Sequence, residues 1–389
     1  MKVENRDMLK ENSFDEKEYE ARIYKVREQM ERQELDLLMI FDPANQFYLS
    51  GYQTVNQDDY RVLLLPKKKK PIILVWQLEE ESVKITTFID YNIYYTGECP
   101  LEVTVNLLRR FCKPGAKIGL EDGGFLNLKT YYYFISKLPD VSFIVCRGVV
   151  EEIRKIKSQS EIECLRQASK ITQKGMYAAI NACKIGNSEN DIVAESLEAM
   201  FKAGSELIAF GPVVSSGYRS GIPHIGNRRK VIKEEETVFI ELGGCYNRYT
   251  APLMRTVYLG NKIPTELEII KEKTMQTLRS IIDAIKPGIS TESIVEIGNK
   301  CLLFEEFQTI FHYVYGYSVG VSFPPSWADK HGVRLCLGNN EILKPGMVFH
   351  LPISIRIPEK YCMGISETVL VTDDGCEQLT KFKEGLIIK

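Results

Sequence analysis

The second half of the chain contains an internal repeat, and this repeat limits the folds that the chain can adopt. The first copy occupies residues 184–193 and the second occupies residues 286–295, and both follow the pattern Lys-x-Gly-x-Ser-x-x-x-Ile-Val. In each copy the glycine is suited to end one helix and the serine is suited to cap the next. A repeated unit of this kind predicts two pseudo-symmetric halves that face each other across a central cleft.

Each half of this region is expected to place helices before strands. Two long helices are predicted over residues 158–183 and 188–203. Strand-like segments follow the helical part of each half, at residues 237–242, 252–259, 347–355 and 367–371. Because the order of helices and then strands occurs twice, we predict an α+β fold with helices on one side of a curved antiparallel sheet. The cleft is then expected on the open face of that sheet.

The first part of the chain is organised differently. An amphipathic helix is predicted over residues 18–34, followed by a buried strand at 35–41 and a turn at 42–45. Strands and helices alternate after this point, with strands at residues 62–65, 71–75, 93–95 and 116–120 and helices near 100–111 and 128–138. This alternation predicts an α/β domain over residues 1–152 and a second domain over residues 153–389.

The composition limits the classes of partner. With 389 residues, 44% hydrophobic and 26% charged, the chain is typical of a soluble globular protein of two domains. The net charge of −2 gives no basis for nucleic-acid binding, and Lys67–Lys70 is expected in a solvated hairpin turn. No apolar stretch approaches the about 20 residues of a membrane span, and the N-terminal residues lack the apolar core of a secretory signal. Ten scattered cysteines without a Cys-x-x-Cys pair favour reduced thiols and a cytoplasmic location.

Several segments of the second domain resemble the creatinase/prolidase/methionine-aminopeptidase superfamily. The resemblance is carried by residues 153–158, 238–244, 255–256, 343–348 and 367–372. In the first domain, Asn45–Gly51 is similar to a turn of the family's N-terminal domain. Together these segments span nearly the whole chain. The resemblance implies a pita-bread C-terminal domain with a pseudo-twofold internal repeat, a creatinase-type α/β N-terminal domain, and a homodimer.

Metallopeptidases of this superfamily hold two divalent metals with five side chains: two Asp, one His and two Glu. The five matching positions in this chain are Glu241, Pro252, Tyr317, Pro352 and Ser366. Proline has no side-chain donor atom, and Ser and Tyr are poor ligands for manganese or cobalt. One carboxylate therefore remains where the paired metals of a peptidase activate water. The resemblance thus implies chemistry without a metal or any other cofactor.

Some members of the superfamily, creatinase and ectoine hydrolase, cleave C–N bonds in small amidine- or guanidine-like molecules without a metal. This chain resembles that branch at Gly217–His224, which is similar to the segment bearing their catalytic histidine, and at residues 316–320, 323–327 and 364–368. The resemblance implies that His224 is the acid/base, with Glu241 and Glu367 as its polar partners. Met254 and Thr250 depart from the pattern of these relatives, so the identity of the substrate stays open.

Six further side chains are candidates for binding a small-molecule substrate: Tyr317, Phe323, Trp327, His350, Arg255 and Arg61. Strand alternation places His350 on the same face as position 352, and therefore in the cleft. Phe323 and Trp327 are suited to form an aromatic rim for a flat or cationic ligand. In creatinase-like dimers the loop that contains Arg61 reaches the pocket of the partner subunit, where an arginine is suited to hold a carboxylate.

Two positions have a structural alternative. Glu241 interrupts an apolar strand, so it either faces a polar cleft or forms a salt bridge, for which Arg255 is the candidate partner. Glu367 lies one residue after Ser366, and a single step along a strand reverses the face to which a side chain points.

The sequence therefore favours a metal-independent hydrolase of non-peptide C–N bonds in a small nitrogen-rich compound. One alternative is an Xaa-Pro peptidase that binds metal through unconventional ligands. Another is a catalytically inactive binding or interaction protein, because a fold does not determine a function.

Overall fold

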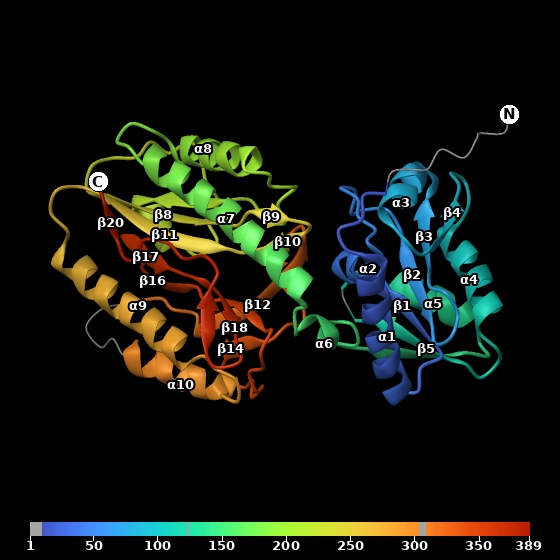
Figure 1. Ribbon diagram of the computed structural model, residues 1–389. Helices are drawn as coiled ribbons and strands as arrows, with labels where there is room; N and C mark the ends of the chain where they lie inside the picture. The colour runs from blue at the N-terminus through green and yellow to red at the C-terminus, as the bar shows by residue number, and fades with distance from the viewer. Residues whose placement is uncertain (1–9, 123, 303–308) are drawn as a thin grey trace. The chain divides into compact units, whose positions relative to one another are not determined.

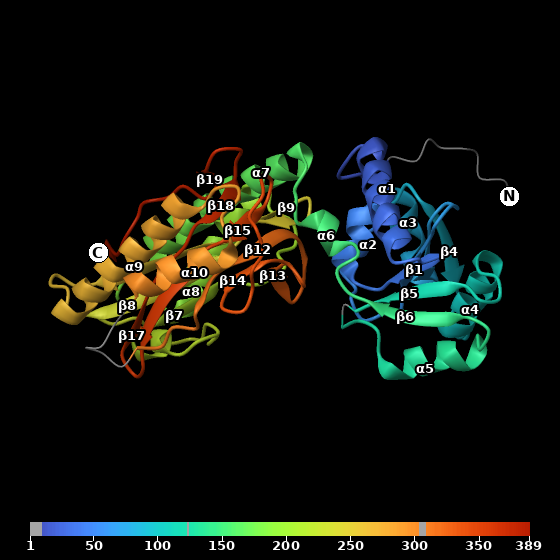
Figure 2. The ribbon, with the colours of Figure 1, turned by 90° about the horizontal axis from the view of Figure 1, so that it is seen from below.

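The computed structural model describes residues 10–122, 124–302 and 309–389. The chain divides into unit 1, which ends at Arg154, and unit 2, Lys155–Lys389. Their helices and strands are labelled in Figure 1 and Figure 2. Each unit contains its own buried hydrophobic core. Among the residues described, no helix is both long enough and apolar enough to cross a membrane.

Unit 1 is built on a six-stranded mixed sheet with the strand order β4-β3-β2-β1-β5-β6. Its strands are β1 (Leu37–Ile40), β2 (Val62–Pro66), β3 (Ile72–Trp76), β4 (Asp90–Tyr94), β5 (Lys117–Glu121) and β6 (Ser142–Cys146). Its helices are α1 (Glu16–Arg32), α2 (Pro43–Ser50), α3 (Glu80–Thr86), α4 (Pro100–Phe111), α5 (Leu128–Lys137) and α6 (Glu151–Arg154). Figure 2 shows α1 and α5 on opposite faces of this sheet. The predicted α/β organisation of the first part of the chain is confirmed.

Two local predictions in unit 1 had different outcomes. The lysine run joins the antiparallel strands β2 and β3, as a hairpin turn should. The turn expected at residues 42–45 is wrong, because this segment begins helix α2. The side chain of Asp42 accepts a hydrogen bond from the backbone N–H of Ala44 at 2.7 Å, and Pro43 occupies the first helical position. Proline is well suited to that position, where its missing N–H removes no hydrogen bond from the helix.

Unit 2 combines two helix pairs with curved, mostly antiparallel sheets. Its helices are α7 (Gln159–Ala182), α8 (Glu189–Lys202), α9 (Thr265–Ala284) and α10 (Thr291–Cys301). One sheet has the order β20-β11-β8-β7, another runs β19-β18-β15-β12-β10-β9 with β13 and β14 paired to β12, and β16 and β17 form a ribbon. The strands are β7 (Val213–Ser216), β8 (Glu236–Leu242), β9 (Cys245–Tyr246), β10 (Tyr249–Thr250), β11 (Leu253–Leu259), β12 (Val314–Phe323), β13 (Ser326–Ala328), β14 (Arg334–Cys336), β15 (Val348–His350), β16 (Ile353–Ile357), β17 (Tyr361–Ile365), β18 (Thr368–Val371), β19 (Cys376–Gln378) and β20 (Ile387–Ile388).

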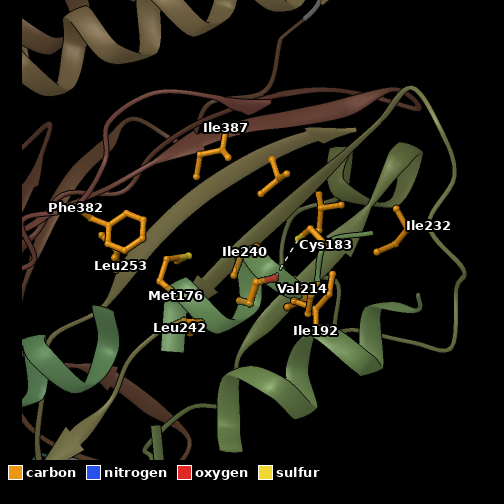
Figure 3. Close-up of a cluster of buried hydrophobic side chains, with 14 of the residues drawn as sticks. Met176, Cys183, Ile192, Val214, Ile232, Ile240, Leu242, Leu253, Phe382 and Ile387 are labelled. Carbon is orange, nitrogen blue, oxygen red and sulfur yellow. Dashed lines mark hydrogen bonds between the residues drawn. The ribbon is translucent and has the colours of Figure 1, made fainter. Parts of the chain in front are cut away.

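The internal repeat corresponds to the two helix pairs. Ser188 caps α8 and Ser290 caps α10, each by accepting a hydrogen bond from a backbone N–H three residues ahead. Gly186 and Gly288 precede them with φ angles of 92° and 87°, the left-handed region that favours glycine. Side chains of α7 and α8 pack on β8 and β11 in the core of Figure 3. Those of α9 and α10 pack on β12 and β15 in a second core. The predicted two-part α+β arrangement is confirmed.

Two strands of unit 2 differ from the prediction. The strand expected over residues 347–355 is interrupted at Leu351-Pro352 between β15 and β16, because proline cannot donate a ladder hydrogen bond. Residues 314–323, where no strand was predicted, form the ten-residue strand β12. Gly316 suits this strand, because a Cβ atom there would lie 2.7 Å from a methyl group of Leu351.

Candidate active site

The five positions that correspond to metal ligands in peptidase relatives lie on, or next to, the inner strands of unit 2. Glu241 is on β8, Tyr317 is on β12, and Pro252, Pro352 and Ser366 lie directly before β11, β16 and β18 or within the turns that lead to them. Glu241 is paired with Met254 across β8 and β11, and the backbone N–H of Ser366 donates to the carbonyl of Met254 at 3.1 Å. Through Met254, the pairing of β8 and β11 therefore brings Glu241 and Ser366 near each other.

A hydrogen-bonded chain of neutral side chains joins two of these positions. Nδ1 of His350 lies 2.8 Å from the hydroxyl of Tyr317, and Nε2 of His350 lies 2.7 Å from the hydroxyl of Ser366. The indole N–H of Trp327 donates to the Tyr317 hydroxyl at 2.9 Å. Burial lowers the pKa of His350 to about 3 and raises the pKa of Tyr317. This chain therefore carries no charge near neutral pH and provides no anionic ligand for a cation.

Glu241 is the one carboxylate left among the five positions, and its environment favours proton transfer. Burial raises its pKa to about 7, although the positive charge of Arg356 opposes the rise. Its carboxylate makes no hydrogen bond or ion pair with the part of the chain that the structure describes. A carboxyl group with a pKa close to neutrality can either accept or donate a proton at physiological pH.

Arg255, the candidate partner of Glu241, forms its salt bridge with Glu367 instead. Arg255 is fully buried and pairs with Glu367, whose other oxygen accepts a hydrogen bond from Thr380 at 2.8 Å. The remaining donors of Arg255 reach the backbone carbonyls of Met254, Ser366, Phe382 and Lys383. Arg255 thus has no N–H group free for a substrate. The structure corrects the roles predicted for both residues: Glu367 points away from the Ser366 side of the strand and belongs to a structural ion pair.

His224 lies in a loop that follows the short 3-10 helix η2 (Gly217–Gly221). Its side chain is exposed, its φ angle is 55°, and it forms no hydrogen bond within the described residues. Desolvation lowers the pKa of His312, and the charges of Arg356 and then His224 lower it further. The backbone N–H of Cys362 donates to the hydroxyl of Ser220 in η2 at 2.9 Å, and Cys362 is paired with Arg356 across β16 and β17, so the 3-10 helix that leads to His224 packs beside the Arg356 ribbon. No direct contact joins His224 to Glu241 or Glu367 in the described part of the chain.

A buried glutamate at the start of α8 holds this loop in place. The carboxylate of Glu189 accepts hydrogen bonds from the backbone N–H of Ser216 and Arg228, both at 2.8 Å, and from Nε of Arg219 at 3.1 Å. Arg219 in turn donates to the carbonyl of Gly226 at 2.5 Å. The loop bearing His224 is thus anchored on both sides by Glu189, the first residue of α8 after its cap Ser188.

The aromatic rim predicted from the sequence is not formed. Trp327 is 5% exposed and packs edge-on against Phe210 at a centroid distance of 5.1 Å. Phe323 is also buried, with the guanidinium of Arg248 4.2 Å from its ring centroid. Both rings serve the packing of unit 2, and Trp327 contributes to the site through its N–H group alone.

Arg61 belongs to unit 1, and its guanidinium is engaged there. It donates to the side-chain oxygen of Gln46 at 2.9 Å, to the backbone carbonyl of Asn56 at 2.8 Å, and to the side chain of Gln57. These bonds fold the loop between α2 and β2. The predicted role of Arg61 in the pocket of a partner subunit stays a prediction.

Arg356 on β16 is a site residue that the sequence analysis missed. It is 6% exposed, its Nη1 donates to the Ser354 hydroxyl at 2.7 Å, and its guanidinium lies 5.3 Å from the ring centroid of Phe239. Its Nε has no hydrogen-bond partner. The signal in the sequence is an arginine inside the apolar strand Ile-Ser-Ile-Arg-Ile of residues 353–357.

The donor set does not fit the pair of divalent metals that the peptidases hold. Within residues 10–122, 124–302 and 309–389, no group of three or more His, Cys, Asp or Glu side chains is arranged to hold a metal ion. Two groups interact electrostatically with Glu241: its charge helps to raise the pKa of the Tyr317 hydroxyl, and the Arg356 cation opposes the rise in the pKa of Glu241 itself. A cation next to the single carboxylate opposes metal binding.

Comparisons with known proteins agree with this architecture. Residues 163–373 match metallopeptidase family M24, and residues 22–156 match the creatinase/prolidase N-terminal domain. The ectoine hydrolase of Halomonas elongata is 27% identical over 398 residues, covering 97% of this chain and 98% of that protein. An Xaa-Pro dipeptidase of Pyrococcus furiosus is 26% identical over 373 residues, covering 94% and 99%.

Solved structures show the same fold. The prolidase from Pyrococcus horikoshii OT3 superposes with a TM-score of 0.82 and 24% identity, covering 94% of this chain and 99% of that chain. The pita-bread domain and its N-terminal companion, predicted from the resemblance, are thereby confirmed. The sequence relatives carry out different reactions, so the residues of the site have to decide between them.

Proposed function

This chain belongs to metallopeptidase family M24, a family of hydrolases, and within it we propose that the protein hydrolyses a non-peptide C–N bond in a small amidine without a metal. The observation that carries the proposal is the state of the five ligand positions. Glu241 is the one carboxylate among them, and the hydroxyls of Tyr317 and Ser366 are hydrogen-bonded to neutral His350. The similarity to an ectoine hydrolase along almost the whole chain supports the same reaction class.

The proposed reaction needs one group that can move a proton near neutral pH. An amidine is cationic at this pH, so the ionised form of Glu241 attracts it and can accept a proton from an attacking water molecule. The water oxygen forms a bond to the amidine carbon, and one C–N bond of the resulting tetrahedral carbon then breaks. The departing nitrogen takes up a proton, so that one amidine and one water give one amide and one amine.

His224 is proposed as the donor of the proton to the departing nitrogen. Histidine exchanges protons near neutral pH, and hydrogen bonds to Glu189 anchor the loop that bears His224. Because His224 is exposed and does not touch Glu241, its role requires that the substrate lie between the two side chains.

The relative named Xaa-Pro dipeptidase makes peptide hydrolysis the competing function. Purified protein, with its metal content measured, should be given ectoine, creatine and Xaa-Pro dipeptides, with and without a chelator. We expect turnover of an amidine or guanidine at the same rate in both conditions. Hydrolysis of a dipeptide that requires added manganese would establish the peptidase instead.

Two variants connect this activity to the site. Glu241→Gln retains the shape of the side chain but cannot exchange a proton, and we expect a loss of kcat of at least about a hundredfold, in the range that general acid–base groups contribute. Glu195→Gln alters an exposed glutamate of α8 and serves as the control. Full activity of Glu241→Gln would eliminate the proposed mechanism.

A further inference from the structure

Arg356 is a buried cation without an anionic partner. It is 6% exposed and forms no ion pair with any described residue, and its single side-chain hydrogen bond is to the hydroxyl of Ser354. Its Nε–H is buried and unpaired. A guanidinium removed from water without a carboxylate is costly, and proteins usually pair such a group. Arg255 shows the usual arrangement in this same unit, because all of its donors have acceptors.

The location of Arg356 relates it to Glu241. Arg356 is paired with Cys362 across β16 and β17, and Cys362 packs in one cluster with Phe239 and Met254. The Arg356 guanidinium lies over the Phe239 ring. Phe239 and Glu241 are two residues apart on β8, so their side chains share one face of that strand. Arg356 and Glu241 therefore border the same part of the site.

The two opposite charges are close but not bonded to each other. The charge of Arg356 opposes the rise in the pKa of Glu241, yet no hydrogen bond or ion pair joins the two side chains. A site that keeps a carboxylate and a guanidinium apart in this way is complementary to a ligand with the reverse arrangement. Such a ligand carries a cationic group for Glu241 and an anionic group for Arg356.

We propose that Arg356 binds the carboxylate of a zwitterionic substrate and thereby selects amidine acids over uncharged or purely cationic amidines. The free Nε–H and a neighbouring N–H of a guanidinium can hold one carboxylate through two parallel hydrogen bonds. The Phe239 ring, whose centroid lies 5.3 Å from the guanidinium carbon, contributes a cation–π contact that helps to hold it. This assignment rests on the proposed function, since it names the class of substrate for the same site.

Calorimetric binding measurements with matched ligands test the assignment without requiring turnover. The ligands are ectoine, a cyclic amidine with a carboxylate, and its carboxamide, which retains the amidine but not the negative charge; creatine and its amide form a second pair. We expect the wild-type protein to bind at least one acid at least tenfold more tightly than the corresponding amide. Equal affinity for acid and amide in both pairs, or no binding of either acid at millimolar concentration, would overturn the assignment.

Variants identify the residue responsible for that preference. Arg356→Gln is expected to weaken binding of the acid at least tenfold and to leave the amide unchanged. Arg248→Gln is the matched control, because Arg248 is also buried over a phenylalanine ring but donates to the backbone carbonyls of Leu207 and Ser322. It should retain the preference. If Arg356→Gln does not fold, Arg356→Lys provides a second test. This variant retains the charge but not the paired N–H groups, so it should lose part of the preference for the acid.

The outcomes separate this assignment from the proposed function. Preferential binding of an acid that is never hydrolysed would support the role of Arg356 and refute the C–N hydrolase. Hydrolysis of an amidine whose binding does not depend on its carboxylate would support the hydrolase and refute the role of Arg356. A folded Arg356→Gln protein that still binds the acid more tightly than the amide would also refute the role of Arg356.

Discussion

At the scale of single residues, burial decides which candidate group can change its charge near neutral pH. Burial raises the pKa of Glu241 to about 7 and lowers the pKa of His350 to about 3. Both shifts favour the uncharged form, as expected when ionised groups are removed from water. Glu241 therefore titrates in the physiological range, whereas His350 remains neutral and acts as a hydrogen-bonding link.

The raised pKa of Glu241 predicts a pH-dependent stability. A carboxyl group with a folded-state pKa above its unfolded value of about 4.3 stabilises the native state below that value, and this contribution is lost as the pH rises through about 7. Glu241→Gln should therefore be more stable than the wild type at pH 8, by up to about 3 kcal/mol, and should show little difference at pH 4. Urea unfolding of both proteins at these two pH values measures the effect. A constant difference between them would contradict the shift.

The neutral chain around His350 predicts a second, non-additive effect on stability. His350→Leu leaves the hydroxyls of Tyr317 and Ser366 buried without their partner, which should lower the free energy of unfolding by about 2–4 kcal/mol. Adding Ser366→Ala removes one of the two hydroxyls that have lost their hydrogen bond to His350. The double variant should then be destabilised by less than the sum of the two single changes, as measured by urea unfolding. Simple additivity would show that the hydrogen bond between His350 and Ser366 contributes little.

At the scale of helices and strands, the features that local chemistry determines could be predicted, and those that depend on cross-strand register could not. The caps of α8 and α10 follow from a serine and its neighbours, so the repeat located them correctly. The bond between His350 and Tyr317 requires the pairing of β12 with β15. No local pattern predicts this hydrogen bond, because no strand was predicted over residues 314–323, where β12 lies. Likewise, Arg255 pairs with Glu367, whereas the sequence offered Glu241 as a candidate partner in one of two alternatives.

The anchoring of the His224 loop predicts a change in local dynamics. Glu189→Gln replaces a carboxylate oxygen with an amide group, which cannot accept all the hydrogen bonds from Ser216, Arg219 and Arg228. Amide hydrogen exchange over residues 213–228 should become at least tenfold faster, because local opening becomes less costly. Glu195→Gln, on the exposed face of the same helix, should leave exchange unchanged. Equal protection in both variants would show that Glu189 does not hold the loop.

At the scale of the whole molecule, the family scaffold is retained while the ligand positions are changed. The TM-score of 0.82 to a prolidase shows that the fold is shared with that protein. Two of the five positions are prolines and two carry hydroxyl groups. The sequence could identify these replacements because each is visible in a single position. It could not show Arg356 next to Glu241, because β8 and β16 meet through packing between sheets.

Because the fold is retained but four of the five metal-ligand positions are replaced, the stability of the folded protein should not depend on divalent metal. In a protein with an intact dinuclear site, bound metal stabilises the native state according to its concentration and affinity, by about 2.7 kcal/mol at one hundred times the dissociation constant. Here one carboxylate lies close to the Arg356 cation, and two other positions are joined through neutral His350. Thermal unfolding should therefore have the same midpoint, within about 1 °C, after treatment with a chelator and in millimolar manganese. An increase of several degrees in manganese, absent at equal ionic strength in potassium chloride, would show that unconventional ligands bind the metal. The peptidase function would then become the better account of the same fold.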